Sequence, residues 1–527
     1  MAIESTRVPE GIQAAPAIIA MFEIYGPAYI GFAVVTSMLG SFATLLTGTI
    51  INVAIPEVMG AFGIGQDKAQ WLSTGFLAAG TVTMLMTAWC MQAFGARITY
   101  VAAMLIFLFG SILGGIALNT ETLIISRVIT GAASGILGPL AMVINFQIFP
   151  VRHRGFAMGL FGIGVVLAPA LGPTLGGLLI DNYSWRYVFF LAVPFSMISI
   201  PLALMFMPGR EKNPVTTPFD WIGCGLISLS LVTILTALTN GQSEGWDSNY
   251  SVTLFATAFL SFVAFAYWEL NIQHPLLDVR IFGHLRFLAS AIVTFIVGIG
   301  LYGSTYLLPL FLQTLQGIMP TDSGLLMLPA GLAMAAFFPI AGALSDRIQP
   351  RLVIIGGLLL FMISSWLMRV VDINTPYALI LVWALIGRIG LALIFPSLNV
   401  ASLATLPMEL LSQGSGAVNF LRQLGGTFGV NLLSIFLARR TSEFSQQIVE
   451  TQVSSPATLE LLLQVQDLLF RDHFGFVMQF PASFGFLSNI IYSQALTQAY
   501  REGFIVIAAV FLIGILPTWF MYVDRKQ

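Results

Sequence analysis

Residues 162–177 read Gly-Ile-Gly-Val-Val-Leu-Ala-Pro-Ala-Leu-Gly-Pro-Thr-Leu-Gly-Gly. They lie in a stretch, 155–180, that contains no charged residue before Asp181. A stretch of this length can cross a bilayer, since roughly 20 apolar residues suffice. Its prolines and glycines would weaken a soluble helix, but in a membrane neighbouring helices satisfy the freed backbone groups and glycines allow close approach. The stretch therefore predicts a tightly packed membrane helix, with or without a role in transport.

The composition extends this prediction to the whole chain. The 527 residues are 57% hydrophobic and 9% charged, against about 25% charged in soluble domains. A net charge of −2 gives no basic surface for nucleic acid. The sequence contains no phosphate-binding loop, dinucleotide fingerprint, nucleophile elbow or cysteine–histidine cluster. We predict an all-α polytopic membrane protein that transports rather than catalyses, with no cofactor and no metal.

Apolar runs predict fourteen transmembrane helices, with ends uncertain by a few residues. Residues 1–27 have no basic start or long apolar core, so we expect a short interfacial helix there rather than a cleaved signal peptide. The predicted spans are 28–52, 70–92, 98–118, 122–148, 155–180, 187–207, 220–240, 252–270, 286–311, 323–344, 351–369, 376–401, 413–438 and 503–523.

The distribution of Lys and Arg predicts the orientation. With the N-terminus in the cytoplasm, twelve of the 22 Lys and Arg residues fall in inner segments, and the short outer loops hold Lys68 and, at an interface, Arg186 and Arg369. This asymmetry follows the positive-inside rule. We therefore expect both termini in the cytoplasm, a location in the cell inner (plasma) membrane, and an external loop at 439–502.

The chain also repeats itself at an offset of 257 residues. Pro139 corresponds to Pro396, Pro150 to Pro407 and Gly172 to Gly429. Parallel repeats of this kind are typical of transporters built from two related bundles. We predict a cytoplasmic segment at 1–27, a six-helix bundle at 28–207, two inserted helices within 208–285, and a second six-helix bundle at 286–527 that includes the external loop.

Several motifs resemble those of the major facilitator superfamily. The opening stretch resembles the antiporter motif G-x-x-x-A-P-x-x-G-P-x-x-G-G, and the segment 342–351 resembles the cytoplasmic loop motif G-x-L-a-D-r-x-x-x-R. The antiporter match is carried by Gly164, Ala168, Pro169, Gly172, Pro173, Gly176 and Gly177, and the loop match by Gly342, Asp346, Arg347 and Arg351. The loop could latch a gate by pairing with helix ends in one conformation, or it could only set the topology.

Further matches point to one branch of that superfamily. Residues 46–56 resemble the first-span motif of the 14-span drug:proton antiporters, and residues 185–190, 275–278 and 422–426 fit that branch as well. The chain thus resembles the EmrB/QacA group along residues 28–523. The resemblance implies two six-helix bundles with two inserted spans, and export of amphiphilic drugs or other small organic molecules by alternating access in exchange for protons.

One position departs from the motif. Where the first-span motif has an Asp, a candidate proton carrier, this chain has Thr47, and we find no Asp or Glu well inside a predicted span. Three arginines do lie inside spans, namely Arg127, Arg388 and Arg422. Arg127 belongs to an R-x-x-x-G motif linked in the family to proton transfer, although it could also snorkel to the outer interface. Arginines without a carboxylate favour anions or neutral amphiphiles over cations, unless they are structural pins.

Small polar residues inside spans are candidates for the substrate cavity. They are Thr47, Thr49, Asn52, Asn145, Gln147, Gln313, Asn399 and Asn419. In residues 439–502, Leu459, Leu462, Val465, Leu469 and Phe470 have helical spacing. The EmrB resemblance implies that this region docks a periplasmic membrane-fusion adaptor that reaches an outer-membrane channel, whereas an amphipathic hairpin lying on the membrane lipid would show the same pattern.

Three functions agree with the sequence to different degrees. An exporter fits the antiporter motif. An importer or facilitator of an organic anion fits the loss of the first-span acid, because the fold alone does not set the direction of transport. A non-transporting membrane partner or sensor fits the departures from the family motifs. The sequence leaves the substrate, the stoichiometry and the oligomeric state open.

Overall fold

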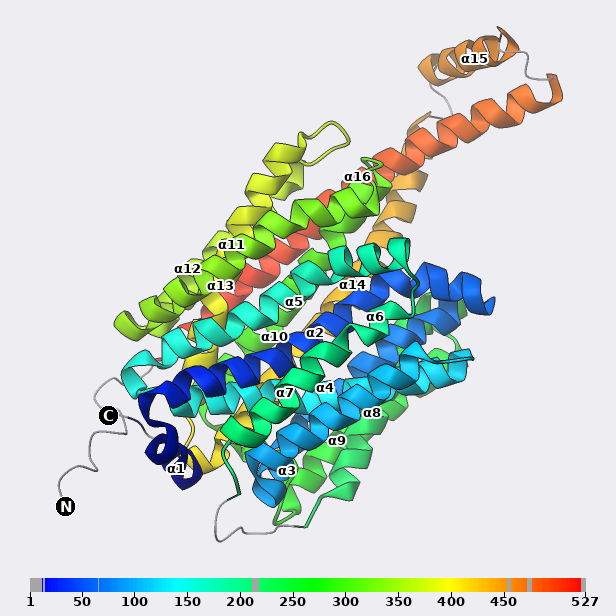
Figure 1. Ribbon diagram of the computed structural model, residues 1–527. Helices are drawn as coiled ribbons and strands as arrows, with labels where there is room; N and C mark the ends of the chain where they lie inside the picture. The colour runs from blue at the N-terminus through cyan, green and yellow to red at the C-terminus, as the bar shows by residue number, and fades with distance from the viewer. Residues whose placement is uncertain are drawn as a thin grey trace, which may run out of the picture.

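The computed structural model describes residues 12, 15–64, 66–210, 218–452, 456–471 and 476–522. Within these ranges every regular element is helical, and Figure 1 shows long helices lying side by side. The helices are α1 Pro16–Tyr25, α2 Tyr29–Phe62, α3 Gln66–Gly115, α4 Thr120–Ile148, α5 Arg154–Asn182, α6 Tyr187–Phe190, α7 Ala192–Phe206, α8 Trp221–Glu244, α9 Asn249–Asn271, α10 Leu285–Thr314, α11 Pro320–Arg347, α12 Pro350–Leu367, α13 Tyr377–Leu403, α14 Leu411–Gln452, α15 Pro456–Arg471 and α16 Phe476–Thr518.

The described helices account for the predicted fourteen spans. Thirteen segments are long and apolar enough to cross a membrane, and one of them, Trp71–Gly115, is 45 residues long. That segment holds two helices, because Gly95 (φ 80°, ψ 161°) is non-helical. Only glycine adopts such a positive φ readily. The chain therefore turns back at Gly95, and the two halves of α3 are separate spans.

The internal repeat is visible in where the helices begin. The offset of 257 residues relates the first residue of α4, Thr120, to that of α13, Tyr377. It also relates the first residue of α5, Arg154, to that of α14, Leu411. Helices α2–α7 form one bundle, and α10–α14 and α16 form the other. Helices α8 and α9 pack on each other, and α8 also packs against α3. The predicted fold of two six-helix bundles with two inserted helices is confirmed.

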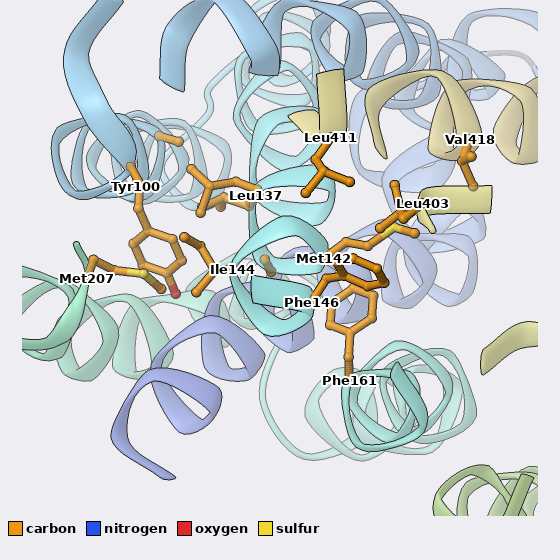
Figure 2. Packing of buried hydrophobic residues seen from close by; sticks show 14 of the residues in the cluster. Tyr100, Leu137, Met142, Ile144, Phe146, Phe161, Met207, Leu403, Leu411 and Val418 are labelled. Carbon is orange, nitrogen blue, oxygen red and sulfur yellow. The ribbon is translucent and has the colours of Figure 1, made fainter. Parts of the chain in front are cut away.

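Both described chain ends lie at the same end of the bundle, which we call the terminal face (Figure 1). Next to this face, an apolar core joins the two bundles. Figure 2 shows Met142 and Phe146 of α4 and Phe161 of α5 close to Leu403 and Leu411 of the second bundle. The short helix α1, expected within residues 1–27, buries Ile18, Met21 and Phe22 in this core. Residues 1–11 and 13–14 lie outside the described part of the chain.

The region 439–502, predicted as an external loop with helical spacing of its apolar residues, is helical in its described parts. Helix α14 continues to Gln452, and α16 already begins at Phe476. Together with α15 they form a helical hairpin that projects from the end opposite the terminal face (Figure 1). Where α14 and α16 leave the bundle, the guanidinium of Arg440 donates to both carboxylate oxygens of Glu502 and to Glu443. These charged residues interrupt the apolar pattern but not the helices. Hydropathy therefore placed the end of α14 too early and the start of α16 too late.

Candidate functional site

Arg422 lies where the two bundles meet. It comes from α14, and only 8% of its surface is exposed. Its Nη2 donates to Oδ1 of Asn399 on α13 (2.7 Å), and its Nη1 donates to Oδ1 of Asn419 one turn earlier on α14 (3.3 Å). The guanidinium also lies over the ring of Phe395, 4.9 Å from its centre. Two of the eight predicted cavity residues, Asn399 and Asn419, thus belong to one site with Arg422.

The first bundle approaches the same site. Nδ2 of Asn419 lies 3.3 Å from the sulfur of Met142 on α4, and one turn earlier the Ser415 hydroxyl donates to the carbonyl of Pro139 (3.0 Å). Next to the arginine, the hydroxyl of Tyr302 on α10 donates to Oε1 of Gln423 (3.1 Å). A movement of one bundle against the other would therefore change the surroundings of Arg422.

The site is positively charged and has only neutral partners. The hydrogen-bond acceptors of its guanidinium are the side-chain amides of Asn399 and Asn419, and neither carries a charge. Nε of Arg422 is buried and has no hydrogen-bond acceptor. A guanidinium with a free donor and no carboxylate partner attracts anions, and it attracts them more strongly in a low-dielectric interior than in water.

Arg127 does not snorkel to an interface. Only 1% of its surface is exposed, its Nε donates to the carbonyl of Leu72 (3.0 Å), and its Nη1 donates to the carbonyl of Thr47 (3.2 Å). The guanidinium lies 4.4 Å from the centre of the Phe76 ring, and Nη2 has no acceptor. Arg127 therefore touches the residue that takes the place of the motif's Asp. The Thr47 hydroxyl itself donates back to the carbonyl of Ala43 (2.9 Å).

Arg388 lies apart from the other two arginines. Its Nη2 donates to the hydroxyl of Thr305 on α10 (3.1 Å). It lines a cavity of about 20 Å³ together with Ser304, Ser364 and Ser365. That volume suits a water molecule rather than a drug. The three arginines of the sequence analysis thus have three separate environments, of which the one around Arg422 lies between the bundles.

The antiporter motif packs α5 against α2. A Cβ on Gly172 would come within 2.5 Å of the Thr49 hydroxyl oxygen, and one on Gly176 within 2.7 Å of the Ile50 side chain. Gly164 lies near Met38 of the same helix α2, and Gly177 has open space around it. The side chains of Pro169 and Pro173 lie outside the described part of the structure, but α5 runs through both positions. The glycines therefore permit a close helix contact within the first bundle.

The predicted cytoplasmic loop motif contacts the first bundle. The carboxylate of Asp346, at the end of α11, accepts hydrogen bonds from the backbone N–H groups of Gly155 (2.7 Å) and Phe156 (3.0 Å). Those groups begin α5, where the helix dipole favours negative charge. The helices touch at two glycines, since a Cβ on Gly342 would lie 2.2 Å from the carbonyl oxygen of Gly155. Arg347 is exposed, and the Arg351 guanidinium lies 5.1 Å from the Tyr522 ring centre.

The family model described as Major Facilitator Superfamily matches residues 37–430. The chain belongs to this superfamily. The multidrug export protein EmrB of Haemophilus influenzae is 29% identical over 414 residues, which cover 78% of this chain and 81% of that protein. The fatty acid resistance protein FarB of Neisseria gonorrhoeae is 28% identical over 488 residues, covering 91% and 94%. The solved structure of the human organic anion transporter MFSD10 aligns with a TM-score of 0.61 at 13% identity, covering 93% of this chain and 99% of that one.

These comparisons confirm the coarse predictions. The chain is a major facilitator transporter with multidrug exporters among its relatives, and it is not an enzyme. The likeness to EmrB confirms the branch that the sequence motifs indicated. The likeness to MFSD10 shows the fold alone, in agreement with the two bundles described above.

The remaining predicted cavity residues of this facilitator do not gather around one arginine. Asn145 is fully buried and donates to the Ser37 hydroxyl (2.9 Å) and the carbonyl of Ala141. Thr49 donates back to carbonyls of its own helix, Gln147 is buried, and Gln313 is half-buried. The side chain of Asn52 lies outside the described part of the structure. Sequence reasoning missed Phe395, Tyr302 and Gly155, because their contacts join helices that are far apart in the chain.

Proposed function

We propose that this facilitator exports anionic or neutral amphiphiles from the cell by alternating access, in exchange for protons. The observation that supports this most directly is the buried Arg422, held by Asn399 and Asn419 between the two bundles without a carboxylate partner. Transporter sites form at such repeat interfaces. We further propose that it resides in the inner membrane with the terminal face toward the cytoplasm.

The positive charge of the Arg422 site supports an acidic amphiphile as the substrate. A guanidinium presents a planar fork of donors that matches a carboxylate or a phosphate, and the Phe395 ring beside it offers an apolar surface. An amphiphile with an acidic head could place its head at Arg422 and its tail against apolar helix surfaces. FarB, a relative with 28% identity, is named for resistance to fatty acids, which have this chemistry. Fatty acids are therefore the first substrates to test.

The contacts at the terminal face support alternating access. There Asp346 holds the first turn of α5, and Gly155 lies against Gly342. These contacts join one bundle to the other, and a few hydrogen bonds at a helix end can break and re-form as the bundles rock. We propose that Gly342, Asp346, Arg347 and Arg351 form the cytoplasmic gate, closed in the conformation described here.

The exposed surface of the projecting hairpin supports the proposal that a partner protein binds there. Leu459 of α15 is 61% exposed, and Leu463, one turn further along, is exposed as well. Of the other residues of the predicted stripe, Leu462 and Val465 are half-buried, and the side chains of Leu469 and Phe470 lie outside the described part. We propose that this apolar surface docks a periplasmic membrane-fusion adaptor linked to an outer-membrane channel. Deleting residues 456–471 should then abolish resistance in cells but leave transport into vesicles unchanged. Loss of both activities would favour a structural role of the hairpin instead.

Accumulation measurements test the direction of transport. Deleting the gene should raise the cellular content of a medium-chain fatty acid severalfold and sensitise the cells to it, while a monovalent cationic dye should accumulate unchanged. Lower uptake of the fatty acid in the deletion strain would show an importer. Unchanged transport of all probes, with purified protein also inactive in vesicles, would leave the non-transporting partner as the function.

A further prediction concerns topology. Single cysteines replacing Lys68 and Thr451 should react with a membrane-impermeant maleimide in intact cells, because both residues are exposed at the end of the bundle opposite the terminal face. A cysteine at Arg210, exposed next to the terminal face, should react only after the cells are opened. The reverse pattern would invert the proposed orientation.

Another prediction concerns Thr47. Thr47→Asp places a carboxylate next to Arg127, whose Nη2 has no acceptor and whose Nη1 already contacts the backbone of residue 47. A buried pair of opposite charges is far better compensated than the lone arginine. We expect transport to become more strongly dependent on the proton gradient and to include cationic substrates. Thr47→Asn, which has the same shape without the charge, is the matched control and should resemble the parent protein.

A further inference from the structure

Arg388 lies on the same side of α13 as the two residues of that helix that contact Arg422. Phe395 and Asn399 follow Arg388 by seven and eleven residues, and these spacings are close to two and three full turns of about 3.6 residues. At about 1.5 Å per residue, Arg388 precedes Phe395 by roughly 10 Å along the helix axis. Since α13 ends at Leu403, in the core next to the terminal face, Arg388 lies further from that face than the Arg422 site does.

Helix α10 also connects the two arginines. Its Tyr302 hydroxyl donates to Gln423, the neighbour of Arg422, and its Thr305 hydroxyl accepts from Nη2 of Arg388 (3.1 Å). Residues three apart in a helix are neighbours on its surface, so the contacts of α10 with the two arginines are one turn apart. Thr305 is exposed and Arg388 is half-buried, whereas only 8% of the Arg422 surface is exposed. In this conformation Arg388 is therefore the more accessible of the two arginines.

The surroundings of Arg388 offer hydrogen-bond donors and no negative charge. The Thr305 hydroxyl donates to the carbonyl of Leu301 (2.6 Å), so its lone pair faces the guanidinium. Ser365 is 4% exposed, lines the cavity of about 20 Å³ beside Arg388, and makes no hydrogen bond through its hydroxyl within the described part of the chain. The described residues that line this cavity include no Asp or Glu. The volume has room for about one oxygen atom, which could accept from both Arg388 and Ser365.

We propose that Arg388 is a second contact for the acidic head of the exported amphiphile, reached after the head leaves Arg422. This inference rests on the proposed function. Without Arg388, an anion released from Arg422 would have no cation beside it in a low-dielectric interior, where an uncompensated charge is costly. A second site lowers this barrier, because a charged solute leaves a membrane protein more readily through several weak sites than from one strong site. One oxygen of the head enters the cavity beside Ser365, and the apolar tail stays outside it.

Separate measurements of binding and transport test the proposal, with radiolabelled octanoate as the probe. Binding is measured at equilibrium on the purified full-length protein, and transport is measured at saturating octanoate in proteoliposomes with equal amounts of protein. Arg388→Gln should leave the dissociation constant within about twofold of the parent value but lower the transport rate about tenfold, the effect of one lost hydrogen bond to a charged group. Arg422→Gln should weaken both binding and transport, because it removes the first site.

Two serines provide a matched pair of variants. Both are buried, but Ser402 does not line the cavity, and its hydroxyl donates to the carbonyl of Leu398 in its own helix (2.7 Å). Ser365→Ala should slow transport about two- to threefold, since it removes one neutral donor, and Ser402→Ala should not slow it. Arg388→Lys keeps the charge and should lose less transport than Arg388→Gln. If Arg388→Gln melts at a lower temperature than the parent protein, Arg388→Lys and Ser365→Ala decide the question.

The possible failures are distinguishable. Unchanged transport in Arg388→Gln, or an equal loss of binding and transport in that variant, would overturn the inference. In either case Arg422→Gln would still weaken octanoate binding if the proposed function holds. Unchanged binding and transport in both arginine variants would instead contradict the proposed function itself.

Discussion

Arg422→Gln is expected to lower transport of a medium-chain fatty acid about 10- to 100-fold. The substitution removes the deepest positive charge between the bundles and the donors that would hold an acidic head. Hydrogen bonds to charged groups contribute about 1.5–3 kcal/mol, which corresponds to that range of affinity. The measurement is the initial rate of transport in proteoliposomes containing equal amounts of purified protein. Neutral amphiphiles should be affected much less, because they do not use the charge.

Graded variants distinguish recognition from structure. Arg422→Lys keeps the charge but loses the planar fork, so we expect an intermediate loss. Asn399→Ala removes the 2.7 Å hydrogen bond that orients the guanidinium and should raise KM more than it lowers kcat. Arg439→Gln is the matched control for net charge, since its side chain is 80% exposed in the projecting hairpin. It should transport as the parent protein does.

Two other results would change this interpretation of Arg422. If the parent protein exports monovalent cationic dyes well and Arg422→Gln does so unchanged, Arg422 has a structural role and the protein binds its substrate at another site. If Arg422→Gln melts at a markedly lower temperature, Arg422→Lys becomes the decisive variant, because it keeps the buried charge and its neutral partners.

The sequence predicted the fold well because a membrane makes hydropathy an almost direct record of the spans. Nearly every backbone group in lipid must be paired within a helix, so apolar runs and helices coincide. The prediction of helix boundaries failed where the pairing of backbone groups in lipid no longer limits the helices to apolar runs. In the projecting hairpin, α14 and α16 continue beyond the charged residues Arg440 and Glu502, which interrupt the apolar runs but not the helices.

The candidate site was harder to predict than the fold. Arg422 could be predicted as a site residue because a charged residue inside an apolar span is rare. Asn399 and Asn419 could be predicted because they are polar residues inside apolar spans. Their meeting point could not be found, since it depends on how α13 and α14 pack against each other. Asp220 and Glu269 lie 49 residues apart in the sequence, each at or near the end of a predicted span. Their contact at Gly223 requires the packing of α8 on α9, which no periodicity reveals.

The second large effect is expected from Gly342→Ala. The added Cβ would lie 2.2 Å from the carbonyl oxygen of Gly155 and 3.0 Å from the Cα of Phe156. Both are backbone atoms, so α11 and α5 must move apart, and the hydrogen bonds from Gly155 and Phe156 to Asp346 must lengthen. If closure of this face is a step of the cycle, transport should fall at least about tenfold, which is roughly 1.4 kcal/mol on the barrier.

Gly356 provides a matched control for the substitution of Gly342. Gly356 lies in α12, and a Cβ there meets no atom within 4 Å. Alanine is the better helix former by about 1 kcal/mol, so helix propensity alone would make both substitutions stabilising. Gly356→Ala should therefore transport as the parent protein does, and a loss in Gly342→Ala must come from the contact with α5. A cysteine at exposed Arg347 should also react faster in the Gly342→Ala background. Equal transport by the two alanine variants would show that the approach of Gly342 to Gly155 has no part in the transport cycle.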